Sequence, residues 1–166
     1  MVGGAPSTLD SPRARHDTVP SGQDRPRVTA TPVEPFSIPI TIQPGDIDEL
    51  GHVNNVVYLR WVQDVATAHW RHAATPEQQA AIAWVVVRHE IDYKHAAVLG
   101  DALTAMTWVG PASRRTFERN TAITRDRDGK LVARARTLWV PIDFTTGKVM
   151  QVGDDVRARF SIGEAE

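Results

Sequence analysis

Acidic, histidine and asparagine side chains gather in one short segment, residues 45–55, directly ahead of an apolar helical pattern. The polar residues of this segment are Asp46, Asp48, Glu49, His52, Asn54 and Asn55, with Gly51 among them. A carboxylate beside the N-terminus of a helix is a base or nucleophile next to unpaired backbone N–H groups. Those groups stabilise negative charge that develops on a carbonyl oxygen. The segment therefore predicts acyl transfer or hydrolysis.

A strand before this segment and a long helix after it must position the polar side chains. Apolar residues at 36, 38, 40 and 42 alternate with smaller or polar ones, which predicts a strand with one buried face. Pro39 inside it indicates a sheet edge or a bulge. Apolar residues at 53, 57, 61 and 65, with a second stripe beside them, predict a helix that is enclosed on most sides. We expect this helix to end between residues 70 and 74, before Thr75-Pro76.

The rest of the chain has the pattern of antiparallel strands, at about residues 84–93, 102–109, 116–125 and 131–142. Alternation in the first of these places Val85, Val87, His89, Ile91 and Tyr93 on one face, and Trp84 and Val86 on the outer face. The predicted fold class is α+β, an antiparallel sheet of about five strands wrapped around one long central helix. Apolar residues on the outer face predict a partner chain, and thus at least a dimer.

Composition divides the chain into a tail and one domain. Residues 1–35 are rich in proline and poor in large apolar side chains, so they cannot bury enough surface to offset their ordering entropy. We expect a disordered N-terminal tail over residues 1–35 and a single domain over residues 36–166. The hydrophobic fraction of 42% is ordinary for a domain with its own core.

Charge and cysteine content exclude several classes of function. The formal net charge of −1 gives no electrostatic basis for nonspecific binding of nucleic acid or anionic membranes. The absence of cysteine excludes disulfides, thiolate nucleophiles and cysteine-ligated metals. The longest apolar run is too short to span a bilayer and no signal peptide is evident, so we expect a cytoplasmic protein.

The polar segment and the following helix together carry a recognisable pattern. It reads D-x-D-x-x-G-H-V-N-N-x-x-Y-x-x-W from Asp46 to Trp61 without a gap, and Ile91-Asp92-Tyr93 followed by Gly100-Asp101 continues the match. In these residues the chain resembles the hot-dog-fold acyl-CoA thioesterases of the 4-hydroxybenzoyl-CoA thioesterase superfamily. The resemblance covers residues 38 to about 140. It implies hydrolysis of an acyl-CoA, or an acyl-carrier-protein thioester, by a homodimer or homotetramer that needs no bound cofactor.

The resemblance also implies roles for residues around the turn. Asp48 matches the family's catalytic carboxylate, which attacks the thioester carbonyl or activates a water. The backbone N–H of Asn55 matches the oxyanion donor at the start of the helix. His52 becomes a residue that positions substrate or orients water, and Gly51 supplies the turn of this catalytic segment. Asp48 could alternatively cap the helix or close an Asx turn, and Gly51 could serve only a positive φ angle.

Four further residues are candidates for substrate binding. Arg114 and Arg115 look like the basic patch by which the 4-hydroxybenzoyl-CoA enzymes hold CoA phosphates, a task suited to paired guanidinium hydrogen bonds. Tyr58 on the helix is either a ligand contact or a core residue. Asp64 lies where related enzymes with a different catalytic arrangement present an acidic residue, and it could equally be a solvated helix residue.

The sequence leaves two alternative functions open and argues against a metal site. Plant fatty-acyl carrier-protein thioesterases carry an additional Asn at the position of Leu50, so this departure favours CoA over their particular catalytic set. A binding module without catalysis, or a hot-dog hydratase or dehydratase, are the alternative functions. His69 and His72 have metal-ligand spacing, but no third ligand is evident and the end of a helix explains them, so we expect no metal site.

Overall fold

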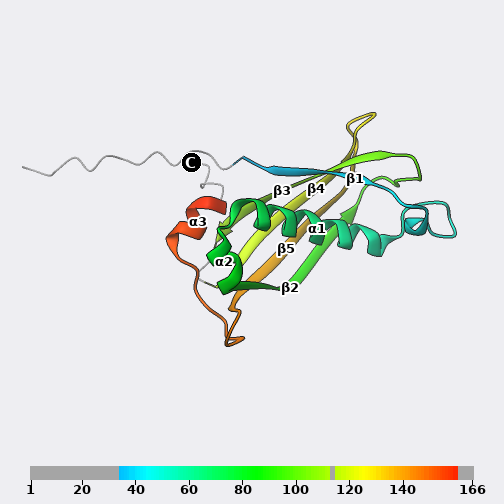
Figure 1. Cartoon of the computed structure of the whole chain (residues 1–166). Helices are drawn as coiled ribbons and strands as arrows, with labels where there is room; N and C mark the ends of the chain where they lie inside the picture. Colours follow the sequence, from blue (N-terminus) through cyan, green and yellow to red (C-terminus); the bar gives the residue numbers. More distant parts are fainter. Residues whose placement is uncertain (1–33, 113–114, 161–166) are drawn as a thin grey trace, which may run out of the picture.

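The computed structural model describes residues 34–112 and 115–160 (Figure 1). Its elements are β1 (Phe36–Thr41), a 3-10 turn η1 (Pro44–Asp46), α1 (Asn55–Ala73), α2 (Pro76–Ala81), β2 (Ile82–Tyr93), β3 (Ala102–Ala112), β4 (Phe117–Arg125), β5 (Leu131–Asp143) and α3 (Asp154–Phe160). The predicted tail, residues 1–35, lies outside the described residues except for its last two positions. Within the described ranges, no helix combines the length and apolarity needed to cross a membrane.

The five strands form one sheet in the order β1-β3-β4-β5-β2, with every neighbouring pair antiparallel. The long helix α1 runs along one face of this sheet, while α2 and α3 lie near the C-terminal end of α1 (Figure 1). The predicted α+β arrangement is confirmed. β1 is an edge strand, which is where a proline such as Pro39 is tolerated because it has no N–H to donate.

The apolar stripes of α1 are buried as their spacing predicts. The buried apolar side chains of this helix are Val57, Tyr58, Trp61, Val62, Val65 and Ala66. Arg71 and His72 lie in its last turn, where cations complement the negative end of the helix dipole. The chain then breaks into α2, which begins with a capping box between Thr75 and Gln78. The predicted end of the helix, between residues 70 and 74, is confirmed.

Two apolar clusters fill the space between α1 and the sheet. One surrounds the first half of the helix and includes Ala105, Ile123 and Ala133 from the three central strands. The other surrounds the second half and includes Val109, Phe117 and Trp139 from the same strands. Buried polar side chains lie between the two clusters along these strands, and we call them the inner polar row: Thr107, Arg119, Thr121 and Thr137.

Arg119 is the unusual member of this row, because a guanidinium is rarely buried without a carboxylate. Its Nη1 group donates to Nδ1 of His69 on α1 at 3.0 Å and to Oγ1 of Thr107 at 3.2 Å. A guanidinium has no acceptor atom, so Nδ1 of His69 must accept and its proton must sit on Nε2. Burial lowers the pKa of Arg119 to about 10. Burial, and then the Arg119 charge, lower the pKa of His69 to about 4.

A β-bulge in β2 overturns the predicted alternation of this strand. Val86 pairs with Trp139 and Arg88 pairs with Leu138, so Val87 is an extra residue. Trp84 and Val86 consequently pack against the second apolar cluster, and the expectation that they lie on the outer face was wrong. Val85 and Val87, expected to share a face with His89 and Ile91, are instead 43% and 58% exposed.

The short helix α3 was not predicted from the sequence. Val156 and Phe160 of this helix are buried in the second apolar cluster. Its first turn carries two acidic residues and its last turn carries Arg157 and Arg159, which is the favourable arrangement for the helix dipole. The signal was available in the four-residue spacing of Val152, Val156 and Phe160, but the segment is short for a pattern-based assignment.

The buried His69 predicts a specific loss of stability in acid. Its pKa is about 4 in the folded chain and its ordinary value is 6.5, so the unfolded state binds the proton first as the pH falls. The free energy of unfolding should therefore drop between about pH 6.5 and about 4. Urea unfolding across this range should show a weaker pH dependence for His69→Gln. The exposed His72→Gln should retain the dependence of the parent, and equal slopes for both variants would contradict the assignment.

Candidate active site

Asp46 anchors the segment that precedes α1. Its carboxylate is buried, accepts a hydrogen bond from the backbone N–H of Gln43 at 2.9 Å and pairs with Arg60 of α1 at 2.6 Å. Its carbonyl oxygen accepts from the N–H of Asn54 at 2.9 Å. Burial opposes ionisation, but the Gln43 and Arg60 contacts outweigh it and hold the pKa of Asp46 below its ordinary value. Asp46 thus holds the turn in place and does not offer a free carboxylate to the cavity.

Asp48 lies in a tight turn that leaves one carboxylate oxygen available. Oδ1 accepts from the backbone N–H groups of Leu50 at 2.9 Å and His52 at 3.2 Å, which is an Asx turn. The carbonyl oxygen of Asp48 accepts from Gly51, whose φ of +77° favours glycine. Among the described residues, Oδ2 has no hydrogen-bond donor. Gly51 therefore provides the positive φ angle and Asp48 closes an Asx turn, as the structural alternatives predicted. One oxygen of Asp48 nevertheless remains free for a substrate.

Asn54, and not Asp48, caps the long helix. The Asn54 side chain accepts from the N–H of Val56 at 3.1 Å, and its carbonyl oxygen accepts from Val57 at 3.0 Å. Asn55 is the first residue of α1, and its own N–H has no acceptor within the described part of the chain. An unsatisfied N–H at a helix N-terminus is a donor for an anionic oxygen. The cap therefore satisfies its neighbours and leaves this one group available.

A cavity of about 380 Å³ lies at this end of α1 and brings the predicted residues together. Asp48, His52, Asn55 and Tyr58 all line it, and Gly51 lies in the turn beside it. Tyr58 is otherwise buried, and its hydroxyl accepts from the N–H of Ala97 at 3.3 Å. The cavity thus combines a carboxylate, an imidazole and a free helix N–H, which are the groups that addition to a carbonyl requires.

The sequence analysis missed three residues that line the same cavity, Tyr93, Lys94 and His95. The Tyr93 hydroxyl donates to the carbonyl oxygen of Asn55 at 3.1 Å, which ties the end of β2 to the start of α1. Nδ1 of His95 lies 2.8 Å from the carbonyl oxygen of Leu131, so Nδ1 donates and Nε2 is left as the second functional atom. The sequence feature that could have indicated these residues is a run of three consecutive polar residues at the end of a strand.

Arg115 and Asp64 do not line this cavity within one chain. Arg114 lies outside the described residues, and Arg115 is exposed just before Phe117, at the start of β4. The other end of β4 is the one near the cavity, because Arg125 donates to the carbonyl oxygen of Ala96 in its wall. Asp64 is exposed on α1 and is not among the residues that line this cavity.

A metal site finds no support in residues 34–112 and 115–160, where no group of three or more potential ligands converges. His69 and His72 belong to the last turns of α1, whereas His52 precedes its first residue, Asn55. The histidine at position 69 uses its Nδ1 atom to accept from Arg119.

The thioesterase-like superfamily matches residues 42–160, and the chain belongs to this family. The long-chain acyl-CoA thioesterase FadM of Escherichia coli strain K12 is 28% identical over 122 residues, which cover 72% of this chain and 92% of that protein. The chloroplastic palmitoyl-acyl carrier protein thioesterase of Gossypium hirsutum is 22% identical over 156 residues. That match covers 80% of this chain, which spans only 37% of the plant enzyme.

Solved structures show the same fold. A Staphylococcus aureus protein, SAV2348, whose structure was determined in complex with CoA, superposes with a TM-score of 0.68 at 16% identity. The match covers 79% of this chain and 84% of the S. aureus chain. The hot-dog fold implied by the sequence pattern is thereby confirmed.

The cap of α1 can be tested separately from the chemistry. Asn54→Ala removes the acceptor for the Val56 N–H and should lower the free energy of unfolding by about 1 kcal/mol. Asn54→Ser retains a capping oxygen and should stay close to the parent. Urea denaturation measures both, and equal stability of the alanine and serine variants would show that the cap contributes nothing.

Proposed function

We propose that this chain is a thioester hydrolase that acts on an acyl-CoA. The observation that carries the proposal is the free Oδ2 atom of Asp48 and the free N–H of Asn55 on the wall of one cavity. The family to which the chain belongs and its similarity to the long-chain acyl-CoA thioesterase FadM support it. A hydrolase of this kind needs no bound cofactor, since the carboxylate and the helix N-terminus supply the base and the oxyanion site.

The reaction follows from these two groups. Asp48 either attacks the thioester carbonyl or removes a proton from an attacking water. In both cases negative charge develops on the carbonyl oxygen, and the Asn55 N–H, aligned with the dipole of α1, stabilises it. The C–S bond then breaks, and in the general-base route the leaving thiolate takes up the proton that Asp48 removed from the water. If Asp48 attacks directly, the bond breaks to give a mixed anhydride with Asp48. A water then hydrolyses this anhydride, which releases the acid, regenerates the carboxylate and supplies the proton of the thiol. His52 orients the water or the substrate beside Asp48, and Tyr58 forms part of the apolar wall.

CoA is the proposed carrier of the acyl group. Support comes from the acyl-CoA substrate in the name of FadM and from the CoA complex of the S. aureus neighbour. The plant relative, which is named for a carrier-protein substrate, keeps that carrier as the second candidate. Leu50 is exposed beside the Asp48 turn, so this position offers no polar group to the reaction. A cytoplasmic location remains a prediction.

We also propose a homodimer formed through β2. This strand is an edge of the sheet, runs over 12 residues and exposes Val85 and Val87, whereas exposed edges are normally blocked or charged. Two copies of β2 related by a two-fold axis must pair antiparallel. Such pairing places the partner subunit's Arg115 at the end of the sheet that carries Asp48. The arginines then contact CoA phosphates from the second subunit.

Asp48→Asn tests the chemistry. The amide keeps the turn but cannot act as a base or a nucleophile, so turnover of acyl-CoA should fall by about a hundredfold or more. Thiol release measured over short, long and aromatic acyl-CoAs reports the loss and defines the acyl preference. The matched control is Glu49→Gln, an exposed acid in the same turn, which should keep the activity of the parent.

Three results would contradict the proposal. Parent-like turnover by Asp48→Asn, with loss of turnover in Asp64→Asn, would move the catalytic acid to the second position. Tight acyl-CoA binding by the parent protein with no thiol release from any substrate indicates a binding module. Hydration of an enoyl-CoA without hydrolysis indicates the hydratase alternative.

The edge strand predicts the oligomeric state. Sedimentation should show a dimer or a larger even-numbered assembly for the parent chain, while Val85→Lys combined with Val87→Lys should shift it to monomers, because like charges then meet across the pairing. Val149→Lys changes an equally exposed valine outside the sheet edge and should leave the assembly intact. A monomeric parent protein, or a double variant that stays associated, would rule out this interface.

A further inference from the structure

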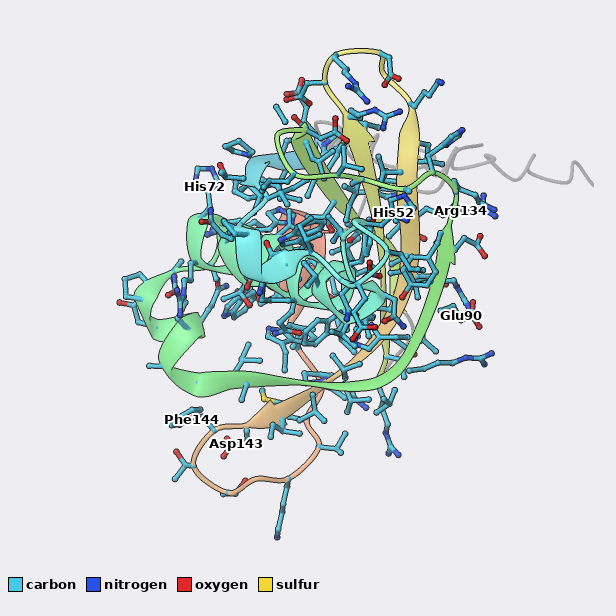
Figure 2. The ribbon with its side chains drawn as sticks, turned by 90° about the vertical axis from the view of Figure 1, so that its right-hand side faces the viewer. His52, His72, Glu90, Arg134, Asp143 and Phe144 are labelled. Atoms are coloured by element: carbon cyan, nitrogen blue, oxygen red, sulfur yellow. The ribbon has the colours of Figure 1, made fainter. Side chains whose placement is uncertain are left out.

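A second cavity lies at the opposite end of α1 from Asp48. It has a volume of about 310 Å³ and shares no lining residue with the first. The C-terminal half of α1, the start of β2 and the helix α3 surround it, and these elements gather at one end of the molecule (Figure 1). Phe144, on the loop after β5, forms part of its wall (Figure 2).

The wall of this second cavity is aromatic and carries only positive charge. Its aromatic residues are Trp70, Trp84, Phe117, Trp139, Phe144 and Phe160. Two arginines, Arg71 and Arg119, also line it, and no described lining residue is acidic. A pocket of this size that combines apolar walls with one fixed polar group is typical of a small-molecule site.

Arg119 has unused donors inside this enclosure. Its Nη1 group is occupied by His69 and Thr107, but Nε and Nη2 have no acceptor among the described residues. Those two groups form the edge of a guanidinium that binds a carboxylate through two parallel hydrogen bonds. Arg119 forms no ion pair with an acid of the described chain, and burial is the cause that lowers its pKa. The cation therefore lacks the partner that a buried charge ordinarily has.

The surrounding polar groups also favour the binding of an anion. Nε1 of Trp84 and Nε1 of Trp139 are buried without an acceptor within the described residues. Indole N–H groups normally find a partner when buried. Two unpaired N–H dipoles in the wall and a guanidinium with free donors make the electrostatic potential positive in a region that water screens poorly.

We propose that the second cavity binds the carboxylate end of a small apolar acid, with the Arg119 guanidinium as its cationic partner. The aromatic walls hold the apolar body, and the paired hydrogen bonds of Nε and Nη2 fix the carboxylate. Binding of a carboxylate at Arg119 goes beyond thioester hydrolysis and does not depend on it, although the second of the two sources below rests on the proposed function. The acid is either a free molecule or the far end of an acyl group whose thioester lies at the Asp48 cavity of a neighbouring subunit.

Calorimetry with 4-phenylbutyrate tests the proposal on the parent protein, and 4-phenylbutyramide is the matched neutral ligand. The two ligands share their apolar body, so the acid should bind roughly tenfold to a hundredfold more tightly if the guanidinium recognises the carboxylate. Equal binding of acid and amide, or no binding of either, overturns the proposal. This comparison needs no variant and is unaffected by any folding defect.

Variants of the two arginines test which of them recognises the carboxylate. Arg119→Met should remove the preference for the acid over the amide, while Arg119→Lys should keep part of it, because the charge remains and the paired geometry is lost. Arg71→Met removes the exposed arginine of the same wall and should keep the full preference. Preference retained in Arg119→Met, or abolished in Arg71→Met, overturns the assignment to Arg119.

A hydrolysis assay distinguishes the two sources of the carboxylate. Competitive inhibition of acyl-CoA turnover by 4-phenylbutyrate identifies the cavity as the place of the acyl end. Binding without competition identifies a separate site for a free acid. Both results retain Arg119 as the carboxylate ligand, and both remain interpretable if the hydrolase proposal itself fails, since binding is then read from calorimetry alone.

Discussion

The burial of α1 against a single antiparallel sheet is the constraint from which the other features follow. A helix of 19 residues satisfies its backbone internally except at its ends, so only the ends can present polar backbone groups to a ligand. At the first end, the Asn54 cap and the Tyr93 contact fix the chain, and one N–H remains open beside Asp48. The fold is therefore linked to the proposed chemistry through a few backbone groups, and this is where we propose that the reacting carbonyl lies.

The inner polar row adds a second constraint, because it interrupts the apolar face of the sheet. Thr107 and Thr121 share a hydrogen bond across β3 and β4, and Arg119 joins them to His69 on the helix. This network separates the two apolar clusters, and each cluster borders a cavity at its own end of α1. The cost of burying a guanidinium is met in part by neutral acceptors, and the remaining donors face a region without acids.

Sequence reasoning predicted the elements whose signals are local and repeated. The period of α1 and the Asp48 turn each depend on neighbouring residues, and the structure places them as expected. The phase of β2 could not be predicted, since a single extra residue at Val87 leaves no periodic trace. The burial of Arg119 and the contribution of His95 depend on which strands become neighbours, which is information that residue spacing does not contain. The proposed contact of Arg115 with CoA depends on the proposed subunit arrangement, which residue spacing does not contain either.

The two edges of the sheet are chemically different. β1 carries Pro39, which has no N–H to offer, whereas β2 presents valines and a continuous backbone. A sheet with one pairing edge can add one further sheet, because the second molecule must use its own single pairing edge for the contact. If β2 is the pairing edge, as we propose, strand addition joins two molecules and does not propagate into a fibre. The proline limits growth of the sheet in the same way that closure limits a ring.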